Sequence, residues 1–539
     1  MSAHFKWYPS SEEVVVPWNA RYSFPSQANK AVKITPRIPP KNGSAFTPGN
    51  VIRVEFPAQG YVNPINTTFE FDVTLNSYGT SSKEIVRFQN NIQSIFTRIR
   101  LLYGATPLED IINYNVIVRA LTEWTSTNQT NTFDQVSISE GIGGTCWGSD
   151  NSGTSVQGLM NVRQAYIQGI DNSANTGAIA TAGTGGGTIP NNQNGTGLTT
   201  TGTTYCTRRY QVNLALGLLT QDKLLPVKFM ASQLAIELSL EQAAACIFAQ
   251  PGGATGAAPT YGVTNFNMIP EILEFDASYD AMFLRGLQEG GVPIKFSSWH
   301  TFIFNTGTAS TLNLLVQERS RSVKALFGIL RRNPPAINSD AHAMLFDSCA
   351  TTGNTMQNYQ WRIGGRYFPS QPVQLSTSVG SAFPNGGAEA FVELQKALNV
   401  VGDYRLSSSV NTNRWAVTTA SAAITTTGGA ATSYNELDYC CNQKAILTTT
   451  GAPTYSLISV ASASGSPFAG NVGSSCYASA VDLETSNGIE ISGLNAEEQS
   501  DIAFIANWSG AQASFSFEVY SYYDAMIILR ENNVLELIQ

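Results

Sequence analysis

Apolar and polar residues alternate along much of this chain with a period of two. The clearest runs cover residues 68–75 and 234–241. The same pattern recurs in four other segments, at residues 301–304, 312–316, 489–491 and 514–520. Such alternation is typical of antiparallel sheets, which place one face on a core and the other toward solvent or a neighbour. The chain is therefore predicted to be all-β.

One segment early in the chain has helical spacing instead. Thr106 supplies a capping hydroxyl, Pro107 suits the first helical position, and Glu109 follows three residues after the cap. Apolar residues then recur at steps of three and four, which predicts a helix from about Pro107 to Trp124. In this interpretation Glu109 interacts with the positive end of the helix.

A second helix is predicted in the later half of the chain. Gly386 and Gly387 precede residues 388–398, which consist mostly of strong helix formers. This helix is predicted to end near Gly402. Each half of the chain thus carries one short helix among many strands.

Low-complexity stretches organise the chain into two β domains. Residues 126–205 and 407–436 are rich in Gly, Ser, Thr, Asn or Ala and exceed the usual length of a loop, so they are predicted to be surface insertions. A Gly- and Pro-rich break lies at residues 250–256. The predicted order is an N-terminal arm (1–45), a first domain (46–250), a linker (251–267), a second domain (268–523) and a C-terminal tail (524–539).

The composition shows an unusually low content of charge. Only 13% of the 539 residues are charged, against about 25% in an ordinary soluble domain, while the hydrophobic fraction is 42%. Disorder is excluded because it requires low hydrophobicity. The net charge of -8 also argues against a protein that condenses nucleic acid on its own surface, because that function needs a basic stripe.

Neither cysteines nor targeting segments indicate an oxidising compartment. No CxxC motif occurs among the seven cysteines, so they are interpreted as reduced, mostly buried thiols. They are Cys146, Cys206, Cys246, Cys349, Cys440, Cys441 and Cys476. The segment Met1–Pro9 lacks the apolar core of a signal peptide, and no apolar run approaches the roughly 20 residues that cross a bilayer. We expect a soluble protein made in a cytosol-like compartment.

No residue pattern for catalysis, cofactor binding or metal binding is present. His4, His300 and His342 lie at no ligand spacing with one another, and the common hydrolase and nucleotide-binding motifs are missing. Glu237 and Glu241 share one face of a predicted strand and could form the carboxylate pair of a glycosidase. The preferred interpretation is a solvated strand face. Catalytic, cofactor and metal residues are therefore predicted to be none.

The densest basic run lies between residues 319 and 332. Its members are Arg319, Arg321, Lys324, Arg331 and Arg332, interleaved with apolar residues. This pattern favours the polar face of a strand pair. The functional alternative is a contact with an acidic partner chain or with a genome.

Three stretches together resemble a known family. They are Ile99–Gly104 followed by the helical pattern over 108–124, Leu224–Phe229 leading into Gln233–Leu238, and Trp361–Pro369. In this order they are similar to the double jelly-roll major capsid proteins of icosahedral double-stranded DNA viruses, a lineage that includes polinton-like viruses, virophages and large eukaryotic DNA viruses. Leu225-Pro226-Val227 and Tyr103-Gly104-Ala105 depart from the large-virus pattern and favour the smaller relatives.

The resemblance implies two tandem antiparallel jelly-roll barrels and a structural, non-enzymatic role without cofactors. It implies a homotrimeric, pseudo-hexagonal capsomer that tiles an icosahedral shell around double-stranded DNA. The implied partners are further copies of the chain, minor capsid and penton proteins, and a membrane or the genome on the inner face. The implied location is the virion, assembled inside an infected host cell.

Other parts of the chain acquire roles under the same resemblance. The two insertions would form towers or trimer locks, while the arm and the segment 531–539 would reach neighbouring proteins. Low charge would suit barrel sides that meet other barrels, because desolvating Lys and Glu is costly. The alternative function is a carbohydrate-binding or glycoside-cleaving β-sandwich that uses aromatic platforms and a carboxylate pair.

Overall fold

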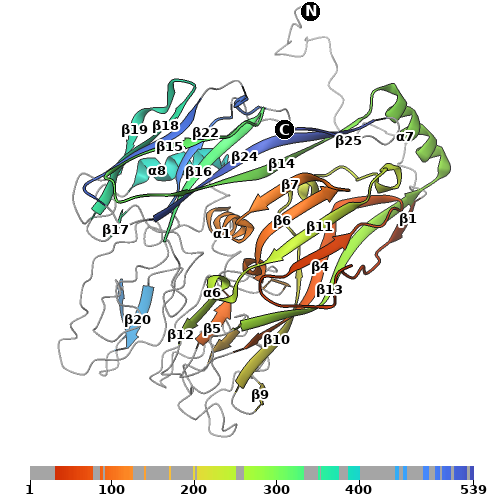
Figure 1. Cartoon of the computed structure of the whole chain (residues 1–539), viewed down its shortest axis with the longest axis horizontal. Coiled ribbons are helices and arrows are strands. Elements are labelled where there is room, and N and C mark those ends of the chain that lie inside the picture. Colours follow the sequence, from red (N-terminus) through yellow and green to blue (C-terminus); the bar gives the residue numbers. More distant parts are fainter. Residues whose placement is uncertain are drawn as a thin grey trace, which may run out of the picture.

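Antiparallel sheets dominate the computed structural model of the chain (Figure 1), which confirms the all-β prediction. The structure describes residues 31–76, 85–88, 92–125, 139–140, 169–171, 198–200, 203–250, 260–332, 350–351, 354–375, 387–400, 443–447, 453–457, 477–484, 492–497, 501–511, 515–530 and 535–539. Most of both predicted insertions and the first 30 residues lie outside these ranges.

The first half of the chain contains two main sheets and one small one. The first sheet consists of β1 (Ala31–Ile34) and β2 (Ala45–Phe46), then β13 (Thr260–Phe275), β4 (Tyr61–Asn76), β10 (Thr203–Val212) and β9 (Leu198–Thr200). The second sheet has the order β3 (Val51–Glu55), β11 (Leu234–Leu240), β6 (Phe96–Tyr103) and β7 (Thr106–Ile112). The small sheet comprises β12 (Ile247–Gln250), β5 (Ile85–Phe88) and β8 (Gly169–Asp171). Short helices accompany them: η2 (Ile92–Ile95), α1 (Tyr114–Thr125), α5 (Gly217–Thr220), η4 (Val227–Phe229) and α6 (Ala243–Cys246).

The second half repeats this arrangement after a connecting helix, α7 (Ala277–Glu289). One sheet has the order β14 (Val292–Asn305), β24 (Phe515–Leu529), β16 (Val323–Arg332) and β22 (Ser479–Asp482), with β25 (Leu535–Ile538) beside β24. The other has the order β15 (Thr311–Val316), β23 (Ile502–Trp508), β18 (Asn354–Ile363), with β17 (Ala350–Thr351) and β19 (Arg366–Gln374) paired to β18. The remaining elements are α8 (Ala388–Ala397) and the hairpin of β20 (Gln443–Leu447) and β21 (Pro453–Leu457).

Both halves have the strand order of a jelly roll. When the eight main strands of each half are numbered along the chain, one sheet reads 1-8-3-6 and the other 2-7-4-5. In the first half, β1 and β2 together make strand 1, because both pair with β13 and Ile38 bridges to Met268 between them. The helix between strands 5 and 6 is α1 in the first half and α8 in the second. The chain is therefore two tandem jelly rolls.

The strand cores follow the predicted alternation. Phe69, Phe71, Val73 and Leu75 are buried on one face of β4, and the apolar residues of β11 are buried in the same way. Buried residues of the two halves form one continuous hydrophobic cluster. Residues 489–491 of the predicted pattern lie outside the described part of the chain.

The predicted start of the first helix is wrong. Residues 106–112 form β7, which pairs with β6 through a tight turn in which Gly104 has a φ of 60°. Helix α1 begins only at Tyr114, after Asn113 adopts a φ of 53°. Long-range pairing with β6 thus overrides the local capping signal at Thr106. The second predicted helix is confirmed as α8, although it ends at Ala397, before Gly402.

The predicted boundaries between arm, domains and tail also need correction. Residues 31–45 of the predicted arm include strand 1 of the first jelly roll, and β13, which spans 260–275, is its last strand. The link between the jelly rolls is α7, a helix that the sequence reading missed. Residues 535–538 of the predicted tail form β25, which pairs with β24 of the same chain, so this segment does not reach out to a neighbour.

Cys246 is the one cysteine whose side chain is described, and it is free and buried. Burial raises the pKa of its thiol well above the ordinary value, in agreement with a reduced core thiol. Within the part of the chain that the structure covers, no helix combines the length and hydropathy needed to cross a bilayer.

Candidate functional site

The two jelly rolls meet in a joint formed by β7, α1 and α5 of the first and by β14 and β16 of the second. Figure 1 shows α1 at the boundary between the halves. The ring of Trp124 on α1 stacks on Phe327 of β16 at 5.4 Å between centroids, and Trp299 of β14 lies 5.7 Å from the same ring. At the strand edges, the Thr301 hydroxyl donates to the Ile112 carbonyl at 2.8 Å. The joint therefore combines an aromatic core with a polar edge.

A buried carboxylate lies at the centre of this joint. Glu109 on β7 is 1% exposed and accepts hydrogen bonds from the backbone amides of Gly217 and Leu218, both at 2.8 Å. The hydroxyl of Ser298, on β14 of the second jelly roll, donates to the same carboxylate at 2.7 Å. One side chain thus binds two segments of the first jelly roll and one strand of the second.

Close backbone approach explains the residue that Glu109 contacts. A Cβ atom at Gly217 would lie 2.0 Å from the carbonyl oxygen of Ser297, so only glycine fits where α5 meets β14. Burial raises the pKa of Glu109, and its three hydrogen bonds oppose that shift. The helix-end role predicted for Glu109 is wrong, because the residue lies in a strand. Its actual partners are more than 100 positions away along the chain.

A second polar group lies at the edge of the same sheet. The Nδ1 atom of His300 on β14 lies 3.2 Å from Glu318, and the imidazole packs on Tyr523 at 4.1 Å between ring centroids. The Ser320 hydroxyl and amide also donate to Glu318. Burial raises the pKa of Glu318, but the hydrogen bonds and charge of His300 and the Ser320 bond outweigh it and bring the pKa to about 2. The other two histidines, His4 and His342, lie outside the described residues.

The basic run between residues 319 and 332 is largely tied to carboxylates of its own jelly roll. Three of its cations have partners within 4 Å: Arg321 with Glu497, Lys324 with Glu484, and Arg331 with Glu518. The last of these pairs is buried. This arrangement agrees with the polar-face interpretation of the run and leaves little of these three cations for a polyanion.

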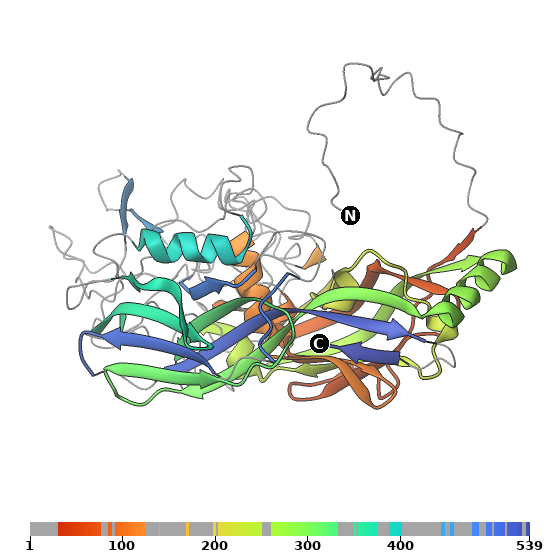
Figure 2. The same ribbon diagram turned by 90° about the horizontal axis from the view of Figure 1, so that it is seen from above.

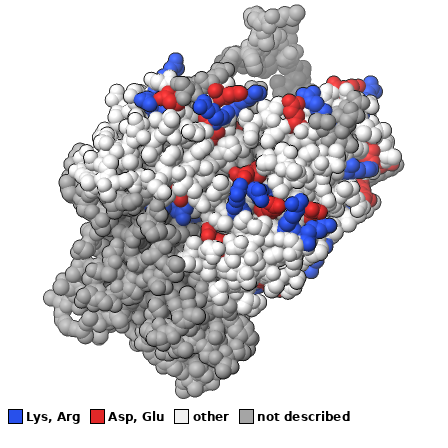
Figure 3. Space-filling model, viewed as in Figure 1, with Lys and Arg blue, Asp and Glu red and all other residues white. Residues whose placement is uncertain are grey.

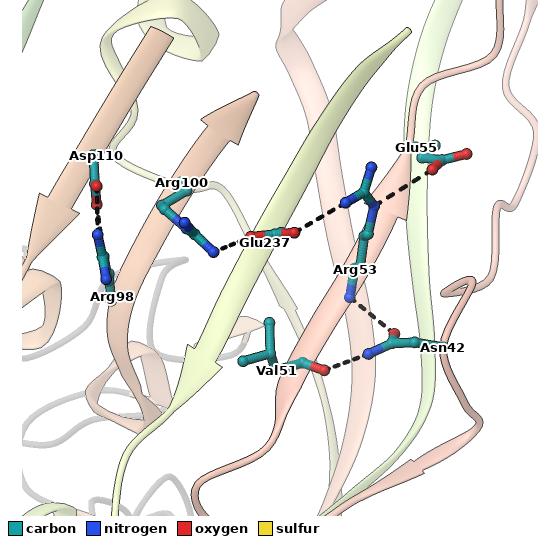
Figure 4. Close-up of polar contacts among 8 residues, drawn as sticks. All are labelled: Asn42, Val51, Arg53, Glu55, Arg98, Arg100, Asp110 and Glu237. Carbon is teal, nitrogen blue, oxygen red and sulfur yellow. Dashed lines mark hydrogen bonds and ion pairs between the residues drawn. The ribbon is translucent and has the colours of Figure 1, made fainter. Parts of the chain in front are cut away.

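An alternating row of charges crosses the outer face of the first jelly roll (Figure 4). Arg53 of β3, Glu237 of β11, Arg100 of β6 and Asp110 of β7 lie opposite one another in register. Glu237 pairs with both arginines, at 3.1 Å from Arg53, and Asp110 pairs with Arg98 at 2.7 Å. The arginine heads remain partly exposed. This face is therefore neutralised within itself and stays solvated.

The candidate carboxylate pair has no glycosidase geometry of its own. Glu237 belongs to the charge row, while Glu241 accepts from the Asn115 amide at 3.1 Å and from the Gln242 backbone at 2.8 Å. Among the described residues, no group of His, Cys, Asp and Glu could hold a metal ion. Figure 3 shows the charged atoms of this face in small mixed groups with wide uncharged areas between them.

Solved structures share this fold. A cryo-EM structure of the Sputnik virophage matches 99% of this chain and 94% of its own chain, with 10% identity and a TM-score of 0.54. The crystal structure of the mavirus major capsid protein (100% and 95% covered, 9% identity, TM-score 0.48) and the Faustovirus major capsid protein (96% and 93%, 9%, 0.45) are also similar. No protein-family model and no curated protein matches the chain.

The strand order and the likeness to the virophage structure together define the class of fold. The chain is a double jelly-roll protein, as its sequence resemblance implied. The likeness extends over almost the whole chain, so it includes both jelly rolls and the joint between them.

Removing the central carboxylate should weaken the joint. We expect Glu109→Ala to lower the free energy of unfolding by about 3 kcal/mol, because two buried amides and a hydroxyl lose their acceptor. The matched control is Asp110→Ala, which breaks a half-exposed ion pair and should cost about 1 kcal/mol or less. Guanidinium denaturation followed by tryptophan fluorescence measures both. Equal losses for the two variants would contradict a central role for Glu109.

The pair at Glu318 predicts a specific dependence on pH. Its pKa is lower in the folded chain than the ordinary 4.5, so its stabilisation is present above about pH 4.5 and is lost as the pH falls toward 2. We expect Glu318→Gln to lower the Tm at pH 7, and the difference from wild type to shrink between pH 4.5 and 2. Thermal denaturation across this range measures the difference. A difference that is constant with pH would contradict the assignment.

Proposed function

We propose that this chain is the major capsid protein of an icosahedral double-stranded DNA virus. Three copies form a pseudo-hexagonal capsomer in which six jelly rolls surround a threefold axis, and capsomers tile the shell of the virion. The role is structural and needs neither catalysis nor a cofactor. The fold shared with the virophage structure supports this proposal.

The observation that carries the proposal is the joint between the jelly rolls. A pseudo-hexagon built from three chains requires the two jelly rolls of each chain to keep one fixed relative orientation. The buried Glu109 bonds and the stacking of Trp124 on Phe327 supply that rigidity. An enzyme with two domains around a cleft more often keeps a mobile interface.

The low charge of the surface supports the same role. Many charges of the first jelly roll are paired within a sheet face, and wide areas between them are uncharged (Figure 3). Uncharged side chains are cheaper to desolvate when capsomers pack side by side. Further copies of the chain are the first partners, followed by minor capsid and penton proteins. The inner face of the shell would meet the genome or a membrane.

The insertions and the N-terminal segment retain proposed roles at these contacts. Residues 126–205 and 407–436 would form outer towers or trimer locks, and residues 1–30 would reach neighbouring proteins. Assembly would take place inside the infected cell. The alternative of a carbohydrate-active β-sandwich has less support, because Glu237 is held between Arg53 and Arg100.

Oligomeric state tests the proposal. We expect the purified chain to run as a trimer of about 174 kDa, three times its 57.9 kDa, in size-exclusion chromatography with light scattering. Negative-stain images should show hexagonal particles with threefold symmetry. A stable monomer at all concentrations would refute the capsomer.

A further inference from the structure

The helices at the same position of the two jelly rolls differ in their surroundings. In the first jelly roll, α1 lies against the second jelly roll, and Trp124 is buried in the joint. In the second, α8 packs on its own jelly roll through Ala390 and Leu394, but Val392 on its other side is 39% exposed. Figure 2 shows α8 outside the sheets, at one end of the molecule. The side of α8 that corresponds to the joint thus has no counterpart within the described chain.

The strands next to these helices show the same contrast. Strand 5 of the first jelly roll, β7, buries Leu108, Glu109 and Ile111 beside β14. Its counterpart β19 is mostly exposed, and Tyr367 on it is 47% exposed. Strand 5 and the following helix therefore form a covered surface in one jelly roll and an open one in the other.

The receiving side of the joint is also present twice. In the second jelly roll, strand 1 is β14, which is covered by β7, and Trp299 on it is buried. In the first jelly roll, strand 1 begins with β1, an edge strand whose residues are all exposed. Val32 is 60% exposed and Ile34 is 36% exposed. An open edge with apolar side chains invites pairing with another chain unless something covers it.

These two open surfaces lie at opposite ends of the long axis of the molecule, β19 at one end and β1 at the other (Figure 1). We propose that α8 and β19 of one copy pack against β1 and the neighbouring face of β4 in the next copy. This contact repeats between chains the joint that α1 and β7 make with β14 and β16 within the chain. It rests on the proposed capsomer and names the surfaces that build it.

Geometry and chemistry both fit this contact. Two different surfaces at opposite ends of one chain make a head-to-tail interface, which closes into a ring when the rotation per copy is a third of a turn. The exposed side chains at its centre are apolar or aromatic, as in the cores of protein interfaces. Lys33, the charged residue of β1, already pairs with Glu271 of its own chain. The contact would therefore bury little unpaired charge.

Charge substitutions on each surface test the proposal. We expect Val32→Glu on β1, and separately the double variant Tyr367→Glu and Val392→Glu, to convert the 174 kDa species into monomers of about 58 kDa with unchanged far-UV circular dichroism. The matched control is Leu315→Glu. Leu315 is 52% exposed on β15, in the sheet that corresponds to the solvated, charge-bearing face of the first jelly roll. The control should remain a trimer.

Mixing the two interface variants tests which surfaces meet. Each variant keeps one intact surface, so an equimolar mixture should form a species of about 116 kDa that neither variant forms alone. If the wild type is a trimer and both interface variants remain trimers, the surface assignment is wrong while the capsomer stands. If the wild type is itself a monomer, the proposed function fails.

Discussion

The rigid connection between the two jelly rolls is the constraint on which the rest of the structure depends. Glu109 is a buried carboxylate whose three hydrogen-bond donors come from α5 and β14, and the close approach of α5 to β14 requires glycine at position 217. A buried charge without these donors would be strongly destabilising, so the bonds and the packing around them depend on one another. The aromatic contact between Trp124 and Phe327 extends the same joint. Two otherwise separate barrels thereby act as one body.

The distribution of charge follows from the same architecture. The ion pairs of the first jelly roll join neighbouring strands of one sheet, as in the row from Arg53 to Asp110. Exposed pairs of this kind contribute little to stability, but they leave the face neutral and hydrated. Apolar exposure is found instead at β1, β19 and α8. A chain with few charges can in this way separate solvated faces from faces suited to assembly.

The two jelly rolls share one strand order but differ where they meet other surfaces. Strand 5 and the next helix are covered in the first and open in the second, whereas strand 1 is covered in the second and open at β1 in the first. An internal interface therefore serves as the pattern for an external one. This relation gives each proposed contact between copies a counterpart whose atoms are already visible within one chain.

The sequence by itself determined the all-β class, the inward faces of β4 and β11, and the helix at α8, because these depend on local periodicity and composition. Family resemblance added the double jelly roll. Tertiary structure decided the state of residues 106–112, since pairing with β6 outweighs a local capping signal. It also assigned β13 to the first jelly roll.

The polar pairs of the joint were equally beyond sequence reasoning. Glu109 meets Ser298 across 189 positions, and His300 meets Glu318 only because β14 and the segment before β16 come together. No local pattern encodes such contacts, because they arise from how sheets pack and not from the order of neighbouring residues. The sequence therefore determined which strand faces are buried, and the tertiary structure alone decided which buried groups meet.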